Sequence, residues 1–218
     1  SSVFSIRISV TPRVRGMDYK TGIDVGSTTV KLVVCDDREN PIHADYRRHH
    51  TRIRETLADM LADALVRRDD LKTTVTLTGS AGLGVAESAG LPFVQEVVAS
   101  TRLVRRRDPG VRTLIEIGGE DSKIVYFDDR HGPDIRMNGS CAGGTGSFIE
   151  QMAVLLHVSL EEFDRLAGAG GEIHAIASRC GVFAKTDIQA LLSGNARRED
   201  VAASVFHAVV LQVLATLA

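Results

Sequence analysis

One short pattern occurs twice in this chain, and it constrains the fold more than any other feature. The first copy reads GIDVGSTTVKLVV from Gly22, and the second reads IEIGGEDSKIVYF from Ile115. Each copy has an apolar run, a polar turn that contains glycine, and a second apolar run. This is the pattern of a strand, a tight turn and another strand. Two such hairpins predict two lobes, each of which offers a turn of backbone N–H groups to one ligand.

Helical and strand patterns alternate along the rest of the chain. Apolar spacing predicts helices over 52–67, 146–156, 183–192 and 199–217, and alternation predicts a strand over 73–78. We expect an N-terminal extension over 1–16, a first lobe over 17–110 and a second lobe over 111–218. The last predicted helix has no cap signal, so we expect the sequence to stop inside a larger protein.

Composition excludes several classes of function. The net charge of −2 does not favour binding to nucleic acid or to an anionic membrane surface. No apolar run approaches the roughly 18 residues of a membrane span. The chain has 3 cysteines and no recognisable signal peptide, which predicts a reducing cytoplasm rather than a disulfide scaffold.

The first polar turn carries residue types that bind nucleotide phosphates. Gly26 lets the backbone approach a phosphate closely. Lys31 adds a positive charge, and Asp24 can hold a hydrated Mg²⁺. Hydroxyls that can donate to phosphate oxygens belong to Ser27, Thr28 and Thr29. An ordinary Gly-Ser hairpin turn with exposed hydroxyls explains this motif equally well when it is taken alone.

The second polar turn repeats this chemistry. Gly118 and Gly119 permit the same close approach, and Lys123 joins them as a candidate for cofactor binding. Asp121 supplies a second carboxylate for a metal ion or a water molecule. Glu120 can orient an attacking water, although a solvated turn acid is an equally good interpretation. Two such hairpins in one chain are hard to explain as unrelated turns.

Two cysteines lie in polar, glycine-flanked segments. Cys141 lies in NGSCAGGTG and Cys180 in SRCGVFAKTD, each at the start of a predicted helix. A helix N-terminus stabilises a thiolate, and its N–H groups can also donate to cluster sulfides. On spacing alone, however, two unrelated buried cysteines are the simpler interpretation, because zinc and iron–sulfur sites usually need four ligands. Cys35 is interpreted as a small buried apolar residue.

The two hairpins resemble the first and second phosphate segments of the superfamily of acetate and sugar kinases, chaperone ATPases and actin. This resemblance implies an α/β fold of the actin-like ATPase type. Such a fold has two ribonuclease-H-like lobes, mixed sheets flanked by helices, and a nucleotide in the cleft. A glycine-rich adenosine motif normally follows, and none is found before Ala218.

The cysteine segments MNGSCAGGTGSFIEQMA and ASRCGVFAKTDIQALL resemble those of the activators of 2-hydroxyacyl-CoA dehydratases and the ATPase subunits of benzoyl-CoA reductases. The resemblance implies ATP or ADP, Mg²⁺, and a [4Fe-4S] cluster held by Cys141 and Cys180 of two identical protomers. It also implies that this homodimer takes an electron from ferredoxin or flavodoxin. The electron then passes to a 2-hydroxyacyl-CoA dehydratase or a related acyl-CoA reductase. The segments SAGLG, PFVQEV and CGVFAKTDIQ are most similar to large multidomain CoA activases, of which this chain would be an N-terminal fragment.

Some residues depart from that family pattern. Glu116 stands where Asp is commoner, and Glu120 stands where Gln is common among the short activators, which leaves the water-positioning role unassigned. Gly144 and Thr145 can contact nucleotide phosphates, but a tight helix entry explains their segment as well.

Two other functions stay open on the sequence. One is a kinase of the same superfamily that phosphorylates a sugar, acetate or a similar small molecule. The other is a non-catalytic nucleotide-binding module. The histidines, including His49 and His50 in a charged stretch before the first long helix, are predicted to have no catalytic role.

Overall fold

The computed structural model describes residues 19–65, 72–128, 130, 132–138, 144–177 and 181–215. The chain divides into two compact units, of which the first ends at Ser100 and the second begins at Thr101. The helix α3 (Glu96–Arg107) crosses this boundary.

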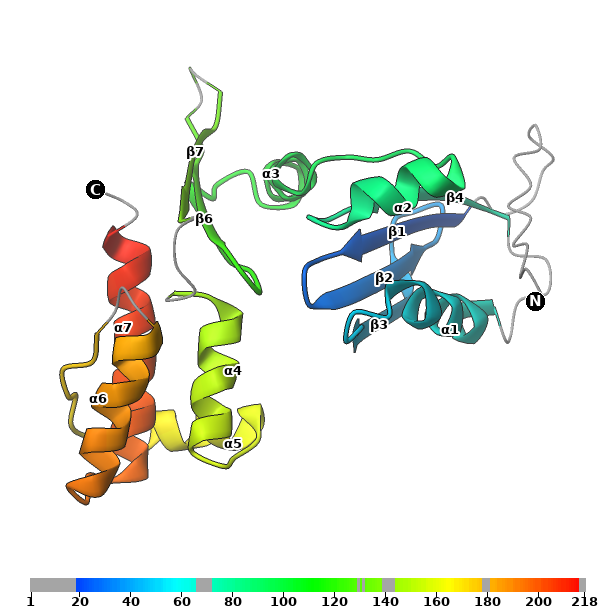
Figure 1. Cartoon of the computed structure of the whole chain (residues 1–218). Coiled ribbons are helices and arrows are strands. Elements are labelled where there is room, and N and C mark those ends of the chain that lie inside the picture. Colours follow the sequence, from blue (N-terminus) through cyan, green and yellow to red (C-terminus); the bar gives the residue numbers. More distant parts are fainter. Residues whose placement is uncertain are drawn as a thin grey trace. The chain divides into compact units, whose positions relative to one another are not determined.

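The first unit is built on a four-stranded mixed sheet (Figure 1). Its strands are β1 (Tyr19–Val25), β2 (Thr29–Cys35), β3 (Pro41–Arg48) and β4 (Thr73–Thr78). The strand order is β3-β2-β1-β4, with β1 and β2 antiparallel, β2 and β3 antiparallel, and β4 parallel to β1. The first predicted hairpin is therefore β1 and β2.

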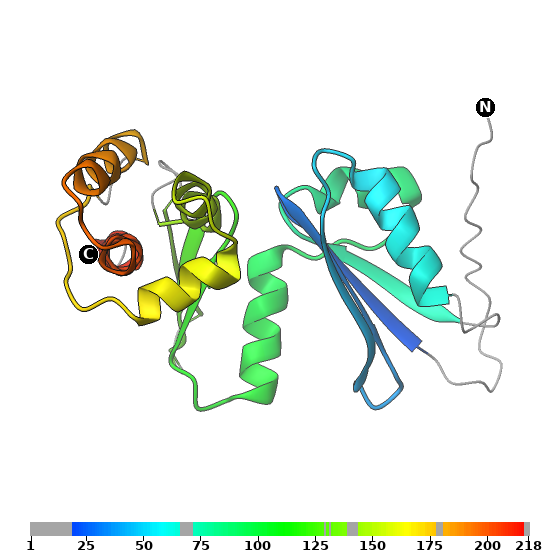
Figure 2. The same ribbon diagram turned by 90° about the horizontal axis from the view of Figure 1, so that it is seen from below.

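Two helices, α1 (Ile53–Leu65) and α2 (Gly82–Ala89), contribute to one core with this sheet. Figure 2 shows the sheet nearly edge-on beside α1. Alternate strand residues face this core, as the two-residue period of a strand requires. The buried apolar residues include Ile23, Val25, Val30, Leu32, Leu57, Met60, Val75, Leu77 and Ala86. The opposite face carries Asp24, Lys31 and Thr78, which lie near the ends of their strands and are only partly buried or exposed.

The second unit contains a three-stranded antiparallel sheet in the order β5-β6-β7. Its strands are β5 (Thr113–Ile117), β6 (Ser122–Tyr126) and β7 (Asp134–Asn138). The second predicted hairpin is β5 and β6. Both hairpins thus have the strand–turn–strand structure that the repeated pattern predicts.

Helices form the rest of the second unit (Figure 1). They are α4 (Gly146–Leu155), α5 (Leu160–Gly168), α6 (Gly181–Ser193) and α7 (Arg198–Ala215). Ser159 caps α5, where its hydroxyl accepts the Glu162 N–H at 3.2 Å. One core joins these helices to β6, and its fully buried members include Ile124, Phe148, Phe163, Ile188 and Val205.

Sequence patterns did not predict β3 or β7. Both are edge strands of their sheets, and neither has a fully buried residue. An edge strand that buries little apolar surface lacks the alternation by which strands are recognised in a sequence. Among the described helices, none is long and apolar enough to cross a membrane.

Candidate functional site

The two predicted phosphate turns share one backbone geometry. We define the first phosphate loop as residues 26–29 and the second as residues 118–121. The Gly26 N–H donates to the Thr29 carbonyl at 2.9 Å, and the Gly118 N–H donates to the Asp121 carbonyl at 2.8 Å. The repeat seen in the sequence therefore extends to the hydrogen bond that closes each loop.

An acid and a lysine face each other at the base of each loop. Asp24 pairs in register with Lys31, and Glu116 pairs with Lys123. Lys31 Nζ lies 2.7 Å from Asp24 Oδ2, and Lys123 Nζ lies 3.6 Å from Glu116 Oε1. Glu116 is thus the counterpart of Asp24, a relation that the sequence had shown only as a departure from the family pattern.

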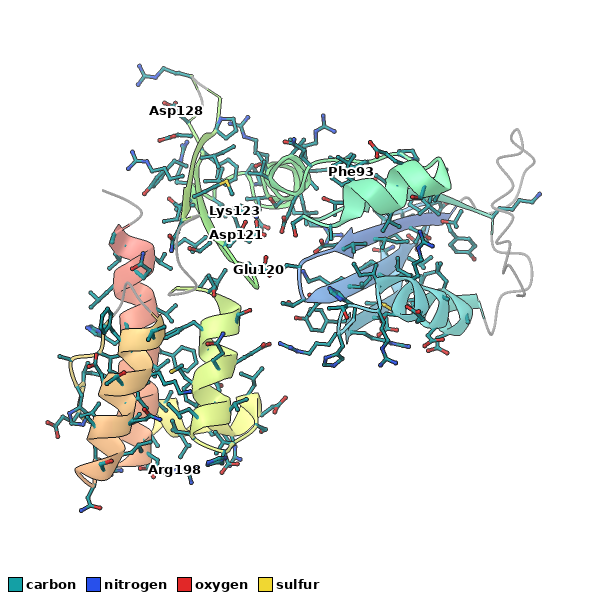
Figure 3. The ribbon with its side chains drawn as sticks, viewed as in Figure 1. Phe93, Glu120, Asp121, Lys123, Asp128 and Arg198 are labelled. Atoms are coloured by element: carbon teal, nitrogen blue, oxygen red, sulfur yellow. The ribbon has the colours of Figure 1, made fainter. Side chains whose placement is uncertain are left out.

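Carboxylate groups lie close to both lysines. Burial alone would lower the pKa of Lys31, but the hydrogen bond and the charge of Asp24 outweigh it, so the pKa is raised above 10.5. Lys123 is only 6% exposed. Its ammonium group lies 3.3 Å from Asp121 Oδ2, near the Glu116 carboxylate, and such pairing is what permits a buried charge. Figure 3 labels Glu120, Asp121 and Lys123 on this hairpin.

Two buried oxygen atoms at the ends of β1 and β4 have no hydrogen-bond partner among the described residues. They are Asp24 Oδ1 and Thr78 Oγ1, which belong to residues paired in register. A buried polar atom without a partner costs about 1–3 kcal/mol. Carboxylate and hydroxyl oxygens, directly or through water, are the ligand type that Mg²⁺ takes. These two atoms therefore fit the cation that the resemblance implies.

Gly79, a residue with no role predicted from the sequence, lies beside these atoms at the end of β4. Its φ is +96°, and a Cβ here would collide with the Val25 carbonyl oxygen and with Asp24 Oδ1. The Ala81 N–H also donates to the Val25 carbonyl at 2.9 Å. Only glycine satisfies both the backbone conformation and the close approach to Asp24. Its sequence signal is a glycine that directly follows a strand.

The loop glycines differ in what the fold requires of them. A Cβ on Gly26 would meet the Thr29 carbonyl oxygen at 3.4 Å, which is an ordinary contact. A Cβ on Gly118 would lie 2.7 Å from Asp121 Oδ1 and 3.1 Å from the Asp121 carbonyl oxygen, so the Asp121 side chain would have to shift. The contact that Gly26 is predicted to make with a phosphate stays a prediction. Ser27 and Thr28 of the first loop are partly exposed, and Thr29 is buried.

The N-terminus of α4 is bonded to the second phosphate loop. The Gly146 N–H donates to the Gly118 carbonyl at 2.8 Å, and the Ser147 N–H donates to the Gly119 carbonyl at 3.2 Å. Helix N-termini leave their first N–H groups without helical partners, and here the loop accepts two of them. These two groups are therefore not free to donate to cluster sulfides, contrary to one expectation from the sequence.

Thr145 and Gly144 form a tight entry to α4. The Thr145 hydroxyl accepts the Phe148 N–H at 3.4 Å, and Thr145 is fully buried. Gly144 has a φ of +82°, and a Cβ there would lie 2.7 Å from Gln212 Cγ of α7. This geometry accounts for both residues without a ligand, and a contact of either with a nucleotide stays a prediction.

His49 contacts two carbonyl groups of the first phosphate loop. Its Nε2 lies 3.2 Å from the Gly26 carbonyl oxygen, and its backbone N–H donates to the Thr28 carbonyl at 3.2 Å. His49 is only 5% exposed. This role was not predictable from the sequence, because a histidine in a charged stretch carries no signal of a buried contact.

The predicted cluster ligands Cys141 and Cys180 lie outside the described residues. Cys180 directly precedes α6, which begins at Gly181. Cys35 has a free thiol and is partly exposed, so the expectation of full burial for it is wrong. Glu120 is exposed in the second loop, and both of its interpretations stay open.

Comparison with known proteins identifies the relatives of this chain. The model of the BadF/BadG/BcrA/BcrD ATPase family matches residues 21–218. The (R)-2-hydroxyglutaryl-CoA dehydratase activating ATPase of Acidaminococcus fermentans is 27% identical over 199 residues, which are 90% of this chain and 76% of that protein. A 2-hydroxyisocaproyl-CoA dehydratase activator of Clostridioides difficile is 30% identical over 202 residues, which are 89% of this chain and 74% of that protein.

Solved structures agree with these relatives. The crystal structure of the Acidaminococcus fermentans (R)-2-hydroxyglutaryl-CoA dehydratase component A matches with a TM-score of 0.79 and 26% identity, over 91% of this chain and 77% of that one. The Clostridium difficile 2-hydroxyisocaproyl-CoA dehydratase activator with bound ADPNP matches with a TM-score of 0.76 and 27% identity, over 91% and 75% of the two chains. The predicted fold class, an α/β fold of the actin-like ATPase type, is confirmed.

Proposed function

Because the chain belongs to the BadF/BadG/BcrA/BcrD ATPase family, we propose that it is an ATP-dependent reductive activator. Its partner would be a 2-hydroxyacyl-CoA dehydratase or a related acyl-CoA reductase, which would receive one electron. Two relatives named as a dehydratase activating ATPase and a dehydratase activator support the class of partner. The donor would be ferredoxin or flavodoxin.

Nucleotide binding would use both phosphate loops. Backbone N–H groups of the loops would donate to phosphate oxygens, together with the hydroxyls of the first loop. Lys31 and Lys123 would neutralise phosphate charge. Asp24 would hold Mg²⁺. Its buried Oδ1, like Oγ1 of the register partner Thr78, has no hydrogen-bond partner in the part of the chain that the structure describes, which supports this assignment. When bound, Mg²⁺ would supply charge neutralisation at the phosphates.

Hydrolysis would use the carboxylates of the second loop. Glu120 is exposed and free to orient a water molecule toward the terminal phosphate. Asp121 is tied to Lys123 at 3.3 Å, which would fix its carboxylate as a second acceptor for that water. Asp24 would act through the metal ion rather than on the water itself.

The proposal of an iron–sulfur site is based on the cysteine motifs. Cys141 and Cys180 of each protomer in a homodimer would supply four thiolates to one [4Fe-4S] cluster. When bound, that cluster would supply one-electron transfer to the partner. In the described part of the chain, α4 and α6 begin a few residues after Cys141 and directly after Cys180.

The observation that carries the proposal is the bonding of α4 to the second phosphate loop. Hydrogen bonds from Gly146 and Ser147 to the loop carbonyls join the proposed nucleotide site to the helix that follows Cys141. A nucleotide that moves this loop would therefore move the start of α4. Such coupling needs ATP and ADP to favour different arrangements, because equal binding to both would shift nothing.

Iron loading tests this proposal. The chain is prepared without oxygen, supplied with iron and sulfide, and analysed for iron, sulfide and quaternary state. We expect about four iron atoms per dimer, with loss of iron in Cys141→Ala and in Cys180→Ala. Cys35→Ala is the matched control and should keep its iron. A colourless monomer that phosphorylates a sugar or acetate would replace the proposal with the kinase function.

A further inference from the structure

Each ring nitrogen of His49 has a fixed hydrogen-bonding role. The Thr51 backbone N–H lies 3.1 Å from Nδ1 and can only donate, so Nδ1 must present its lone pair. A neutral imidazole then carries its proton on Nε2, and this N–H donates to the Gly26 carbonyl oxygen at 3.2 Å. The contacts therefore select the neutral Nε2–H tautomer.

The two bonds from His49 fix the direction of the loop N–H groups. In a trans peptide, the carbonyl of one residue and the N–H of the next point in opposite directions. His49 holds the carbonyls of Gly26 and Thr28 on one side. The N–H groups of Ser27 and Thr29 therefore point to the other side, away from His49. Two N–H groups on one side of a short turn form an anion site.

The backbone beside His49 is strained. His50 has a φ of +44° and Thr51 has a φ of +65°, which is unfavourable for a β-branched residue. Strain of this kind costs about 1–3 kcal/mol per residue and persists only where the surroundings impose it. The Arg52 N–H donates to the His49 carbonyl at 2.7 Å, so this turn also links His49 to the start of α1.

In the second unit, the N–H groups of a helix hold the carbonyls of the loop. There the carbonyls of Gly118 and Gly119 are held by the first two N–H groups of α4. In the first unit, the His49 ring holds the carbonyl of Gly26, which corresponds to Gly118. Its backbone N–H holds the carbonyl of Thr28, one residue beyond the place that corresponds to Gly119. His49 thus holds the first carbonyl of its loop as the N-terminus of α4 holds the first carbonyl of the second loop.

We propose that His49 is a positioning residue for nucleotide binding, because as the Nε2–H tautomer it turns the Ser27 and Thr29 N–H groups toward a phosphate of ATP or ADP. This proposal rests on the proposed function, in which the first phosphate loop binds the nucleotide. His49 itself does not touch the phosphate.

Three substitutions test the two hydrogen bonds of the His49 ring separately. His49→Asn keeps an acceptor near Nδ1 for Thr51 and removes the donor to Gly26. His49→Gln keeps a donor near Nε2. His50→Asn is the matched control, because His50 is exposed and Asn tolerates positive φ. Binding of MgADP and of a non-hydrolysable ATP analogue is measured by calorimetry on each chain, with urea unfolding to confirm folding.

We expect His49→Asn to weaken both nucleotides about tenfold, the equivalent of one hydrogen bond. His49→Gln should restore affinity to within about twofold of the unsubstituted chain, and His50→Asn should not change it. Equal affinity in His49→Asn and the unsubstituted chain would overturn this proposal alone. If the unsubstituted chain binds neither nucleotide, the proposed function fails, and this proposal fails with it.

A second readout does not depend on nucleotide. Nitrogen-15 NMR of the imidazole shows which ring nitrogen carries the proton. We expect the neutral Nε2–H form of His49 in the folded chain, whereas a proton on Nδ1 at neutral pH would contradict the hydrogen bonds described and overturn the proposal.

Discussion

Replacing Gly146 with proline would cut one of the two hydrogen bonds that join α4 to the second phosphate loop. Gly146 is the first residue of α4, a position where helices accept proline. The preceding Thr145 has φ −121° and ψ 164°, which is the extended conformation that a residue before proline adopts. The substitution should therefore remove the N–H bond to Gly118. Because the proline Cδ takes the place of the hydrogen that lies against the Gly118 oxygen, it should also push that carbonyl away, while α4 stays helical.

The expected change in the free energy of unfolding follows from the loss of this one hydrogen bond. Its loss costs about 0.5–1.5 kcal/mol, and a buried Gly118 carbonyl left without a partner would raise the cost to about 1–3 kcal/mol. The fixed φ of proline also lowers the conformational entropy of the unfolded chain, which offsets about 0.4–1 kcal/mol of this loss. We expect a net loss of at least about 1–2 kcal/mol in the free energy of unfolding, because the loop must also shift to make room for the proline Cδ. Gly146→Ala is the control, because it keeps the N–H and adds only a Cβ 3.2 Å from the Gly118 oxygen.

Hydrogen exchange read by mass spectrometry, with and without MgADP, is the assay for coupling. In the unsubstituted chain and in Gly146→Ala, nucleotide should slow exchange of the amides at the start of α4. In Gly146→Pro this response should be weakened, because only the bond from Ser147 to Gly119 remains, while the chain still binds MgADP. A full response in the proline variant would refute the reasoning, because the bond would then not transmit the change.

Two further predictions concern stability. Gly79→Ala should lower the free energy of unfolding by more than about 2 kcal/mol, because a Cβ is unfavourable at positive φ and collides with Val25 and Asp24. Urea denaturation measures this change. Gly84→Ala is the control, because a Cβ at Gly84 would meet open space. The Asp200 carboxylate accepts the N–H groups of Gly171 and Glu172, which hold its pKa below 3.8. Its stabilising contribution is therefore complete above pH 3.8 and fades as the pH falls through the lower folded value. Asp200→Asn should show a smaller loss of stability on acidification, and an unchanged acid profile would contradict this.

Much of the fold was predictable because its signals are local. The alternation of apolar residues around each turn predicted both hairpins, and helical spacing predicted α1, α4, α6 and α7. The acid and the lysine of the first loop, Asp24 and Lys31, were also visible in the sequence, and they pair in register. The acid of the second loop, Glu116, was visible only as a departure from the family pattern. Edge strands such as β3 were not predictable from the sequence, because they bury little apolar surface.

The parts that were not predictable depend on contacts between distant residues. His49 meets Gly26 only because β3 lies beside β2 and returns the chain to the first loop. Gly79 approaches Asp24 only because β4 runs parallel to β1. The role of α4 could not be read from the GGTG segment, because the acceptors of its N–H groups lie at Gly118 and Gly119. In each case the sequence shows the residue type and leaves its partner open.

The central claim is that a nucleotide held by the two loops acts on an iron–sulfur cluster bound by Cys141 and Cys180. Electron paramagnetic resonance of the oxygen-free, dithionite-reduced protein tests it most directly, with MgADP and MgATP compared on one sample. We predict the signal of a reduced [4Fe-4S] cluster whose shape changes when MgATP replaces MgADP, and its absence in Cys141→Ala. An iron-free protein, or a cluster signal that persists without Cys141, would contradict the account.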